Sequence, residues 1–225
     1  MNSYNEPFRL SPRLRLCAEF VRQGSAVADI GTDHAYLPVW LCKMNIAKSA
    51  LACDIGQEPL QNGKETIKRY NAGEQVKTRL CDGLSGVAPS EADDIVIAGM
   101  GGETIVHIIN SWRYSNSFGK HFILQPMTKS ELLIEYLCKN GYEILAQRCC
   151  FDKKIYTVIL AEYSGEVKDY PKEFYYLGKL SPCSCAEDKK YIEKEIRNLE
   201  NKAKGNPNYL QTAQKLRAVC EGAMQ

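Results

Sequence analysis

The apolar positions between residues 26 and 125 fall into short runs separated by segments of helical periodicity. Turn residues bound each run, and the runs have the length and composition of buried strands. Strands that alternate with helices predict an α/β fold, in which helices cover both faces of a parallel sheet. The five predicted strands are Ala26–Ile30, Ala50–Asp54, Val76–Cys81, Ile95–Ala98 and Phe122–Gln125.

A further helix is predicted before the first strand, over residues 11 to 22. Ser11 suits the N-cap, Pro12 suits the first helical position, and apolar residues then recur at helical spacing. The opposite face of this helix is basic. That face is either solvated surface or a contact for phosphate groups, and its basic residues are Arg13, Arg15 and Arg22, with Arg9 just before the helix.

The pattern changes in the stretch "YEILAQRCCFDKKIYTVILAEY", which contains two β-rich runs. Only Asp152, Lys153 and Lys154 join them, and a link this short permits an antiparallel hairpin but no crossover helix. A parallel sheet that ends in such a hairpin resembles the seven-stranded mixed sheet of class I methyltransferases, a Rossmann-like fold.

The C-terminal part of the chain becomes polar from about residue 163 and carries two apolar stripes at helical spacing. The segment "KGNPN" between the stripes is a stop signal followed by a restart. We therefore predict an antiparallel helical hairpin, similar to a coiled coil, that packs on itself or on the sheet domain. The stripes are Ile192, Ile196, Leu199 and Ala203, and then Tyr209, Ala213, Leu216 and Cys220.

The composition is that of an ordinary globular protein, with 44% hydrophobic and 25% charged residues in 225. A net charge of +2 provides no global field, so any nucleic acid must bind to a local basic patch. The N-terminus lacks the apolar run of a signal peptide, and no segment has 18 consecutive apolar residues. We expect a cytoplasmic protein with no membrane partner.

The ten cysteines are scattered and lie mostly inside apolar runs. We interpret them as thiols that pack like small hydrophobic side chains. A single CxC motif, at Cys183 and Cys185, has no second pair and no nearby histidine, so it gives weak support for a zinc site. No metal is expected.

The candidate chemistry lies in the stretch "VADIGTDHAYLP", where a strand runs into a turn with one glycine, Gly31. A dinucleotide site needs several glycines so that backbone amides can approach the pyrophosphate, and the carboxylate of Asp33 would repel that group. S-adenosylmethionine carries an ammonium and a sulfonium and no phosphate. The acidic turn therefore favours S-adenosylmethionine over a nicotinamide cofactor.

Acids also follow the next two predicted strands. Asp54 is placed to accept hydrogen bonds from ribose hydroxyls, and Asp82 from an adenine amino group. Either acid alone is more often a turn residue or helix cap, but their coincidence at successive strand ends favours a cofactor site. The fourth strand ends in "IAGMGG", which offers the carbonyl groups of Ala98 and Gly99 as acceptors. The alternative for this segment is a tight turn required only for packing.

Together "VADIGTDHAYLP", "CDGL", "IAGMGGETI", "LQP" and "YTVILAE" resemble the bacterial tRNA (adenine(22)-N(1))-methyltransferases over residues 9 to about 163. The resemblance implies methyl transfer from S-adenosylmethionine to N1 of an adenine in the D-arm region of tRNA. One departure is Asp54, where glutamate is frequent in the family. The residues implied to line the cofactor are Asp29, Ile30, Gly31, Thr32, Asp33, His34, Ala35, Leu37, Asp54, Ile55, Cys81, Asp82, Gly83, Ala98, Gly99, Met100 and Gly101.

For this reaction the expected catalytic residues are Asp33, His34, Tyr36 and Gly99. N1 of adenine has an in-plane lone pair, so alignment is the main task, and an acceptor for the N6 amine would stabilise the cationic product. We expect Asp33 or a backbone carbonyl to accept from the base, and His34 and Tyr36 to orient or stack on it.

The target base must leave its stack to expose N1, so the enzyme needs additional contacts with the RNA. We expect a Rossmann-like catalytic domain over residues 1–163 and a tRNA-binding hairpin over residues 164–225. The basic residues expected to contact tRNA, each of which is alternatively solvated surface, are Arg9, Arg13, Arg15, Lys189, Lys190 and Lys194.

Two other functions remain open from the residues. One is a class I methyltransferase that acts on a small molecule or another RNA, and the other is a non-catalytic module that binds the cofactor. We expect a monomer or weak dimer in each case.

Overall fold

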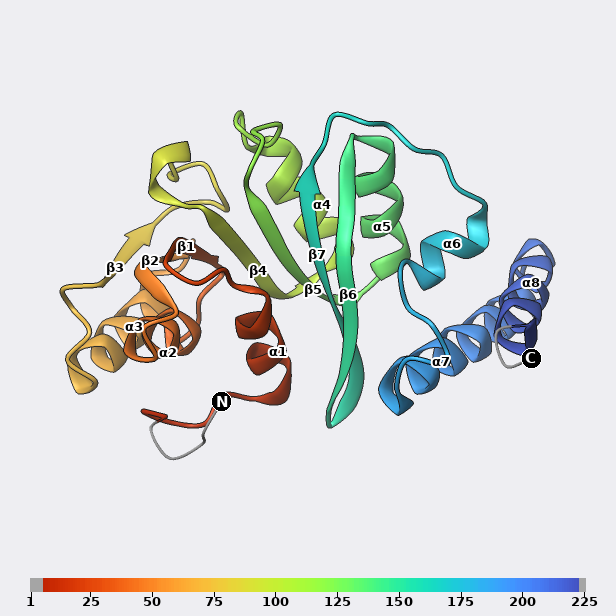
Figure 1. The fold of residues 1–225 in the computed structure, drawn as a ribbon, viewed down its shortest axis with the longest axis horizontal. Helices are drawn as coiled ribbons and strands as arrows, with labels where there is room; N and C mark the ends of the chain where they lie inside the picture. Colours follow the sequence, from red (N-terminus) through yellow and green to blue (C-terminus); the bar gives the residue numbers. More distant parts are fainter. Residues whose placement is uncertain (1–5, 223–225) are drawn as a thin grey trace.

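The computed structural model describes residues 6–222, and within them it forms one seven-stranded sheet with flanking helices (Figure 1). The strands are β1 Ser25–Ile30, β2 Ala47–Asp54, β3 Val76–Leu80, β4 Asp94–Gly101, β5 His121–Thr128, β6 Tyr142–Asp152 and β7 Lys154–Tyr163. The helices are α1 Pro12–Phe20, α2 Tyr36–Lys43, α3 Gln57–Arg69, α4 Gly102–Ser111, α5 Ser130–Lys139, α6 Lys172–Leu177, α7 Ala186–Ala203 and α8 Asn208–Gly222.

The strand order is β3-β2-β1-β4-β5-β7-β6. The first five strands in the chain are parallel, whereas β7 pairs antiparallel with both β5 and β6. The mixed sheet and its terminal hairpin are therefore confirmed. Strand order reverses between β1 and β4, and open parallel sheets bind ligands beyond the carboxyl ends of the strands at such a point.

Two apolar clusters cover the two faces of the sheet. Side chains of α1, α2 and α3, among them Leu16, Trp40 and Ile67, pack on one face. Side chains of α4 and α5, among them Ile105 and Leu133, pack on the other. The strands between these layers are buried on both sides, which explains their continuous apolar runs.

The segment "IAGMGG" forms the end of a strand that is longer than the predicted Ile95–Ala98. Strand β4 continues to Gly101, and Gly99 is an extra residue that has no partner on β5, where Ala98 pairs with Gln125 and Met100 with Pro126. The bulge explains the positive φ of 81° at Gly99. Pro126 is accommodated because β7 pairs with β5 only as far as Leu124.

Helix α4 then begins at Gly102, where packing alone requires glycine. A Cβ at this position would overlap the carbonyl oxygen of Lys129. The packing explanation for this glycine-rich segment is therefore correct for its last glycine.

The C-terminal helices form the expected antiparallel pair and also pack on the sheet domain. Their apolar stripes form a third cluster that includes Cys149 of β6 and Leu199 of α7, and the short helix α6, which was not predicted, lies beside them. In Figure 1 this pair occupies the end of the molecule next to β6. A buried hydrogen bond of 2.6 Å between the hydroxyls of Ser130 and Tyr191 joins α5 to α7.

The cysteines are thiols and do not form disulfide bonds. Five are buried, three are half-buried, and the CxC pair is exposed, so the packing interpretation holds for most of them. Among residues 6–222 no helix has the length and apolar character needed to cross a membrane.

Candidate functional site

A cleft of about 690 Å³ lies beyond the carboxyl ends of β1 and β4. It is bordered by the turn after β1, by the bulge in β4, by the segment leading into α1 and by the end of α3. Its lining residues are Phe8, Arg9, Leu10, Ser11, Arg13, Leu14, Asp29, Gly31, Thr32, Asp33, His34, Ala35, Tyr36, Leu37, Arg69, Tyr70, Ala98 and Gly99.

The turn after β1 depends on the glycine at position 31. Gly31 has a φ of 78°, and a Cβ there would overlap the methyl group of Met100. The N–H groups of Gly31 and Thr32 both donate to the carbonyl of Cys53, at 2.9 Å each. These two amides are therefore used to hold the turn against β2, which leaves the next amides in the turn for a ligand carboxylate.

Asp29 is buried at the base of this turn, with 7% of its surface exposed. The pKa of its carboxyl group is raised to about 6, mainly by burial; a hydrogen bond with Thr32 opposes the shift, and the nearby charge of Asp54 adds to it. Thr32 also accepts a hydrogen bond from the N–H of Ala35, at 3.1 Å. A carboxylate in this position costs free energy unless a nearby cation or hydrogen bonds offset its burial.

Asp33, His34 and Tyr36 extend from the turn toward solvent. Nε2 of His34 lies 3.3 Å from a carboxylate oxygen of Asp33, whose side chain is 75% exposed. The His34 ring stacks on Tyr36 with centroids 5.3 Å apart. The three residues predicted to contact the target base therefore line one side of the cleft.

A buried glutamine holds the bulge in β4, on the opposite side of the cleft from the turn. Oε1 of Gln125 accepts from the N–H of Gly99, at 3.1 Å, and from Nη1 of Arg13, at 3.2 Å. Nε2 of Gln125 donates to the carbonyl of Pro126, at 3.0 Å, so the orientation of the amide is defined by its partners. Arg13 also pairs with Asp152 at the tip of the β6–β7 hairpin, at 3.5 Å.

The predicted nucleoside end of the site lies beside this cleft rather than in its lining. Asp54 ends β2, and its carboxylate accepts from the N–H of Gly56 at 2.7 Å. Next to it Ile55 and Leu80 are 71% and 52% exposed, and Asp82 is exposed as well. Exposed apolar side chains between two carboxylates fit the flat face of a nucleobase.

Cys81 lies between these groups, and its N–H donates to the carbonyl of Asp54 at 3.0 Å. A hydrogen bond with the Cys53 thiol lowers the pKa of Cys81 to about 7 and raises that of Cys53 well above its usual range. The thiol of Cys81 is thus more acidic than an ordinary cysteine.

Four of the predicted cofactor residues lie in other surroundings than the cleft lining. The side chain of Ile30 belongs to the core, so only its backbone can meet a ligand. Met100 covers Gly31, while Gly83 and Gly101 do not line the cleft.

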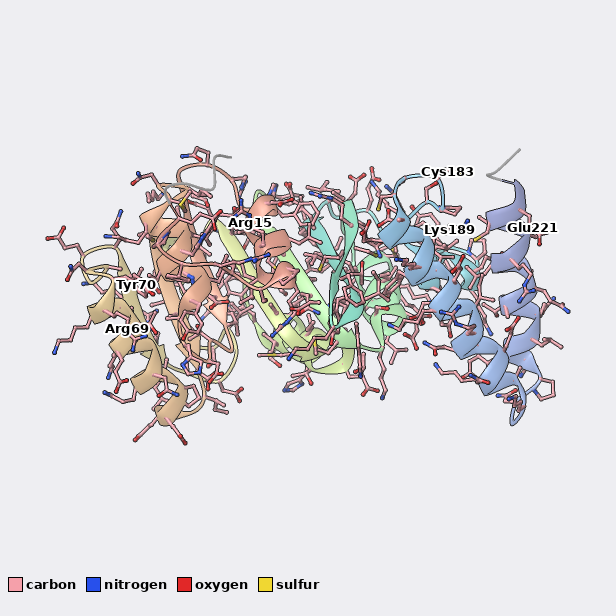
Figure 2. The ribbon with its side chains drawn as sticks, turned by 90° about the horizontal axis from the view of Figure 1, so that it is seen from below. Arg15, Arg69, Tyr70, Cys183, Lys189 and Glu221 are labelled. Carbon is pink, nitrogen blue, oxygen red and sulfur yellow. The ribbon has the colours of Figure 1, made fainter. Side chains whose placement is uncertain are left out.

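The predicted RNA-binding residues are in different situations. Arg9 lines the cleft and is exposed. Arg13 donates a hydrogen bond to Gln125 and forms an ion pair with Asp152. Arg15 pairs with Glu6 and lies over the ring of Trp40. In Figure 2 Lys189, on α7, is far from Arg15 along the molecule; Lys190 is exposed, and Lys194 is half-buried over Tyr191.

Sequence reasoning missed several residues that line the cleft, and it missed Gln125, which supports the bulge without lining the cleft. Phe8, Arg69 and Tyr70 are isolated in the sequence, and no spacing connects them with the turn. Gln125 stood inside the "LQP" motif, so its polarity at the end of an apolar strand was a usable signal. Within residues 6–222 no group of three or more His, Cys, Asp or Glu side chains is arranged to hold a metal ion.

Comparison with known proteins gives three kinds of similarity. Residues 10–159 match the family model described as a methyltransferase domain. The chain is 35% identical over 155 residues to the tRNA (adenine(22)-N(1))-methyltransferase of Bacillus subtilis, an alignment that covers 68% of this chain and 65% of that relative. The match thus spans about two thirds of the relative's length.

Two solved structures resemble the chain over nearly its whole length. A Streptococcus pneumoniae protein in complex with S-adenosyl-L-methionine is 27% identical, with a TM-score of 0.83 and coverage of 92% of this chain and 98% of that one. TrmK of M. capricolum, in complex with the cofactor product S-adenosyl-homocysteine, is 27% identical, with a TM-score of 0.77 and coverage of 96% and 98%.

Proposed function

This chain belongs to the family of methyltransferase domains. From this premise and from its similarity to the Bacillus subtilis enzyme, we propose that it is a bacterial tRNA (adenine(22)-N(1))-methyltransferase, which methylates N1 of adenine 22 in the D-arm of tRNA with S-adenosylmethionine as donor. The observation that carries the proposal is the acidic turn at the switch point of the sheet. There Gly31 permits the positive φ on which the turn depends, and Asp29 and Asp33 supply negative charge. The turn suits a cationic cofactor without phosphates and disfavours a dinucleotide.

The residues around the turn fit this cofactor. When bound, S-adenosylmethionine supplies an electrophilic methyl group on a sulfonium centre. The buried carboxylate of Asp29 would attract its ammonium group, and the amides of Asp33 and His34 would receive its carboxylate. Asp54 would hold the ribose hydroxyls, with the exposed side chains of Ile55 and Leu80 against the adenine.

The cleft beside the turn would hold the target adenine. Because N1 has an available lone pair, the chain needs no general base and acts mainly by alignment. Asp33 and the carbonyl of Gly99 line the cleft and are placed to accept from the N6 amine, which increases electron density at N1. A carboxylate near the base also neutralises the positive charge that methylation creates.

The helical hairpin would supply the second contact with tRNA. We propose that residues 164–225 form an RNA-binding domain whose lysines, Lys189, Lys190 and Lys194, contact phosphates. Its packing on β6 and its hydrogen bond to α5 hold the hairpin in a defined position relative to the cleft.

The test uses an unmodified tRNA transcript and a matched transcript in which adenine 22 is replaced by guanine. With S-adenosylmethionine present, the first transcript should gain 1-methyladenosine, measured by mass spectrometry of nucleosides, and the second should not. A reverse-transcription stop should map to position 22. Absence of 1-methyladenosine, or equal product from both transcripts, would contradict the proposal.

A further inference from the structure

Four aromatic rings form a continuous row along one wall of the cleft. Starting at the turn, His34 stacks on Tyr36, Tyr36 meets Phe8 edge to face at 5.5 Å, and Phe8 packs on Tyr70 at 4.6 Å. We call these four residues the aromatic wall. It joins three separate parts of the chain, namely the turn after β1, the segment before α1 and the end of α3.

The wall has faces that remain accessible. All four residues line the cleft, Tyr36 is 39% exposed, and Phe8, His34 and Tyr70 are half-buried. Rings that served only the core would be buried, as Trp40 and Phe122 are. An accessible aromatic row in a polar cleft is a platform on which a planar ligand can stack.

Two arginines without acidic partners flank the outer end of the wall. Arg9 and Arg69 line the same cleft and are exposed, and neither forms an ion pair with a carboxylate in residues 6–222. By contrast, Arg13 pairs with Asp152, Arg15 with Glu6, and Arg22 with the buried Asp94. Figure 2 shows Arg69 and Tyr70 next to each other at the end of α3. Arg9 and Arg69 are therefore the arginines of this region that are available to an anion.

We propose that the aromatic wall, with Arg9 and Arg69, binds a nucleotide of the RNA that flanks the target adenosine. The flanking base would stack on Phe8 and Tyr70, and its phosphate would lie between the two guanidinium groups. The inference rests on the proposed function, and it adds a second nucleotide site to the same cleft.

The layout of the cleft separates the flanking nucleotide from the target. Asp33 and Gly99, the groups suited to the reacting base, lie at the end of the cleft nearest the turn and the bulge. The wall leads from there to the end of α3, with Tyr36 between the two sites. Stacking on an aromatic ring is possible for every base, so we expect this contact to add affinity for the strand with little dependence on its sequence.

The test measures tRNA binding directly, by fluorescence anisotropy with labelled transcript in the presence of S-adenosyl-homocysteine, together with steady-state methylation. Tyr70→Leu and Phe8→Leu should each weaken tRNA binding by roughly tenfold, the scale of one lost stacking contact. Tyr70→Phe should bind like the wild type, since the ring is kept. Arg69→Gln should weaken binding and lower the slope of log affinity against log salt by about one contact.

Two matched variants control for general surface effects. Phe118→Leu removes an aromatic side chain that is 70% exposed in the loop before β5, and Lys68→Gln removes an exposed charge beside Arg69 that does not line the cleft. Both should bind tRNA within twofold of the wild type. Affinity for S-adenosyl-homocysteine should be unchanged in all variants, which verifies their fold.

The possible results separate this inference from the proposed function. If the wild type methylates adenine 22 but Tyr70→Leu and Phe8→Leu bind tRNA as tightly as Phe118→Leu, the aromatic wall does not bind RNA, and the proposed function is supported. If the Tyr70→Leu and Phe8→Leu variants alone lose tRNA binding but the wild type forms no 1-methyladenosine, RNA binding by the aromatic wall is supported and the proposed reaction is wrong. If the wild type does not bind tRNA, both are wrong.

Discussion

The guanidinium of Arg13 donates a hydrogen bond to Oε1 of Gln125, at 3.2 Å, although the two residues are 112 positions apart in the chain. The same oxygen accepts from the N–H of Gly99, so a residue of α1 supports the bulge in β4 through a fully buried amide. Arg13 is thus a positioning residue for the side of the cleft that carries Gly99. Its commitment to Gln125 also makes it less available to RNA phosphates than Arg9.

Gln125→Leu should lower kcat by at least tenfold, because the N–H of Gly99 and the guanidinium of Arg13 would both lose their acceptor. Loss of a buried acceptor typically costs about 1–3 kcal/mol, which should also appear as a lower melting temperature. Gln125→Glu keeps an oxygen for both donors and places a carboxylate beside Arg13, so it should retain more activity than Gln125→Leu. Equal kcat values for these two variants, measured at saturating tRNA, would show that the bond has no role in positioning.

Gly31→Ala should abolish cofactor binding and destabilise the protein. Alanine at a φ of 78° is strained by about 1–2 kcal/mol, and its Cβ would overlap the methyl group of Met100. Gly24→Ala is a matched control, since Gly24 has the same φ of 78° but open space around the Cβ position. The melting temperatures of both variants separate the effect of backbone strain from that of overlap with Met100. Calorimetric titration with S-adenosylmethionine measures the affinity for the cofactor. If Gly24→Ala were as destabilised as Gly31→Ala, overlap with Met100 would make no contribution to the loss of stability.

The strand-end groups could be predicted because a parallel sheet brings the carboxyl ends of its strands to one edge. Gly31, Asp54 and Asp82 lie at the ends of three successive strands. Once the strands were recognised, the proximity of these residues followed from the parallel sheet. The positions of Arg13 and Gln125 could not be predicted in the same way. A basic helix face looks the same whether its arginines meet solvent or a buried amide from a distant strand.

The aromatic wall was equally hidden from sequence reasoning. Phe8 lies before the first helix and Tyr70 directly follows α3, where neither takes part in an apolar period. Their contact arises from the packing of α1, α2 and α3 on one face of the sheet. Tertiary packing of this kind leaves no local pattern, whereas secondary-structure periods and turn residues do.

Tyr191→Phe should destabilise the protein by about 1 kcal/mol, because it removes the buried hydrogen bond between α7 and Ser130 of α5. Tyr209→Phe is a suitable comparison, since the ring of Tyr209 packs in the same cluster and under Lys202 and should keep those contacts. Denaturant unfolding of both variants gives the difference in free energy. Equal stabilities would mean that apolar packing alone holds the helical hairpin on the sheet domain.

Cofactor affinity should rise as pH increases through about 6, because burial raises the pKa of Asp29 into that range and only the ionised form attracts an ammonium group. The opposite sign is expected for stability without cofactor. The folded state binds a proton at Asp29 more tightly than the unfolded chain does. The contribution of Asp29 to the free energy of unfolding is therefore fully present below pH 4 and is lost as pH rises through 6. Asp29→Asn removes both dependences, and it should bind S-adenosylmethionine weakly at every pH while gaining relative stability above pH 6. Calorimetric titration and melting curves between pH 5 and 8 measure the two effects, and a wild-type affinity that does not change over this interval would exclude Asp29 as the partner of the cofactor's ammonium group.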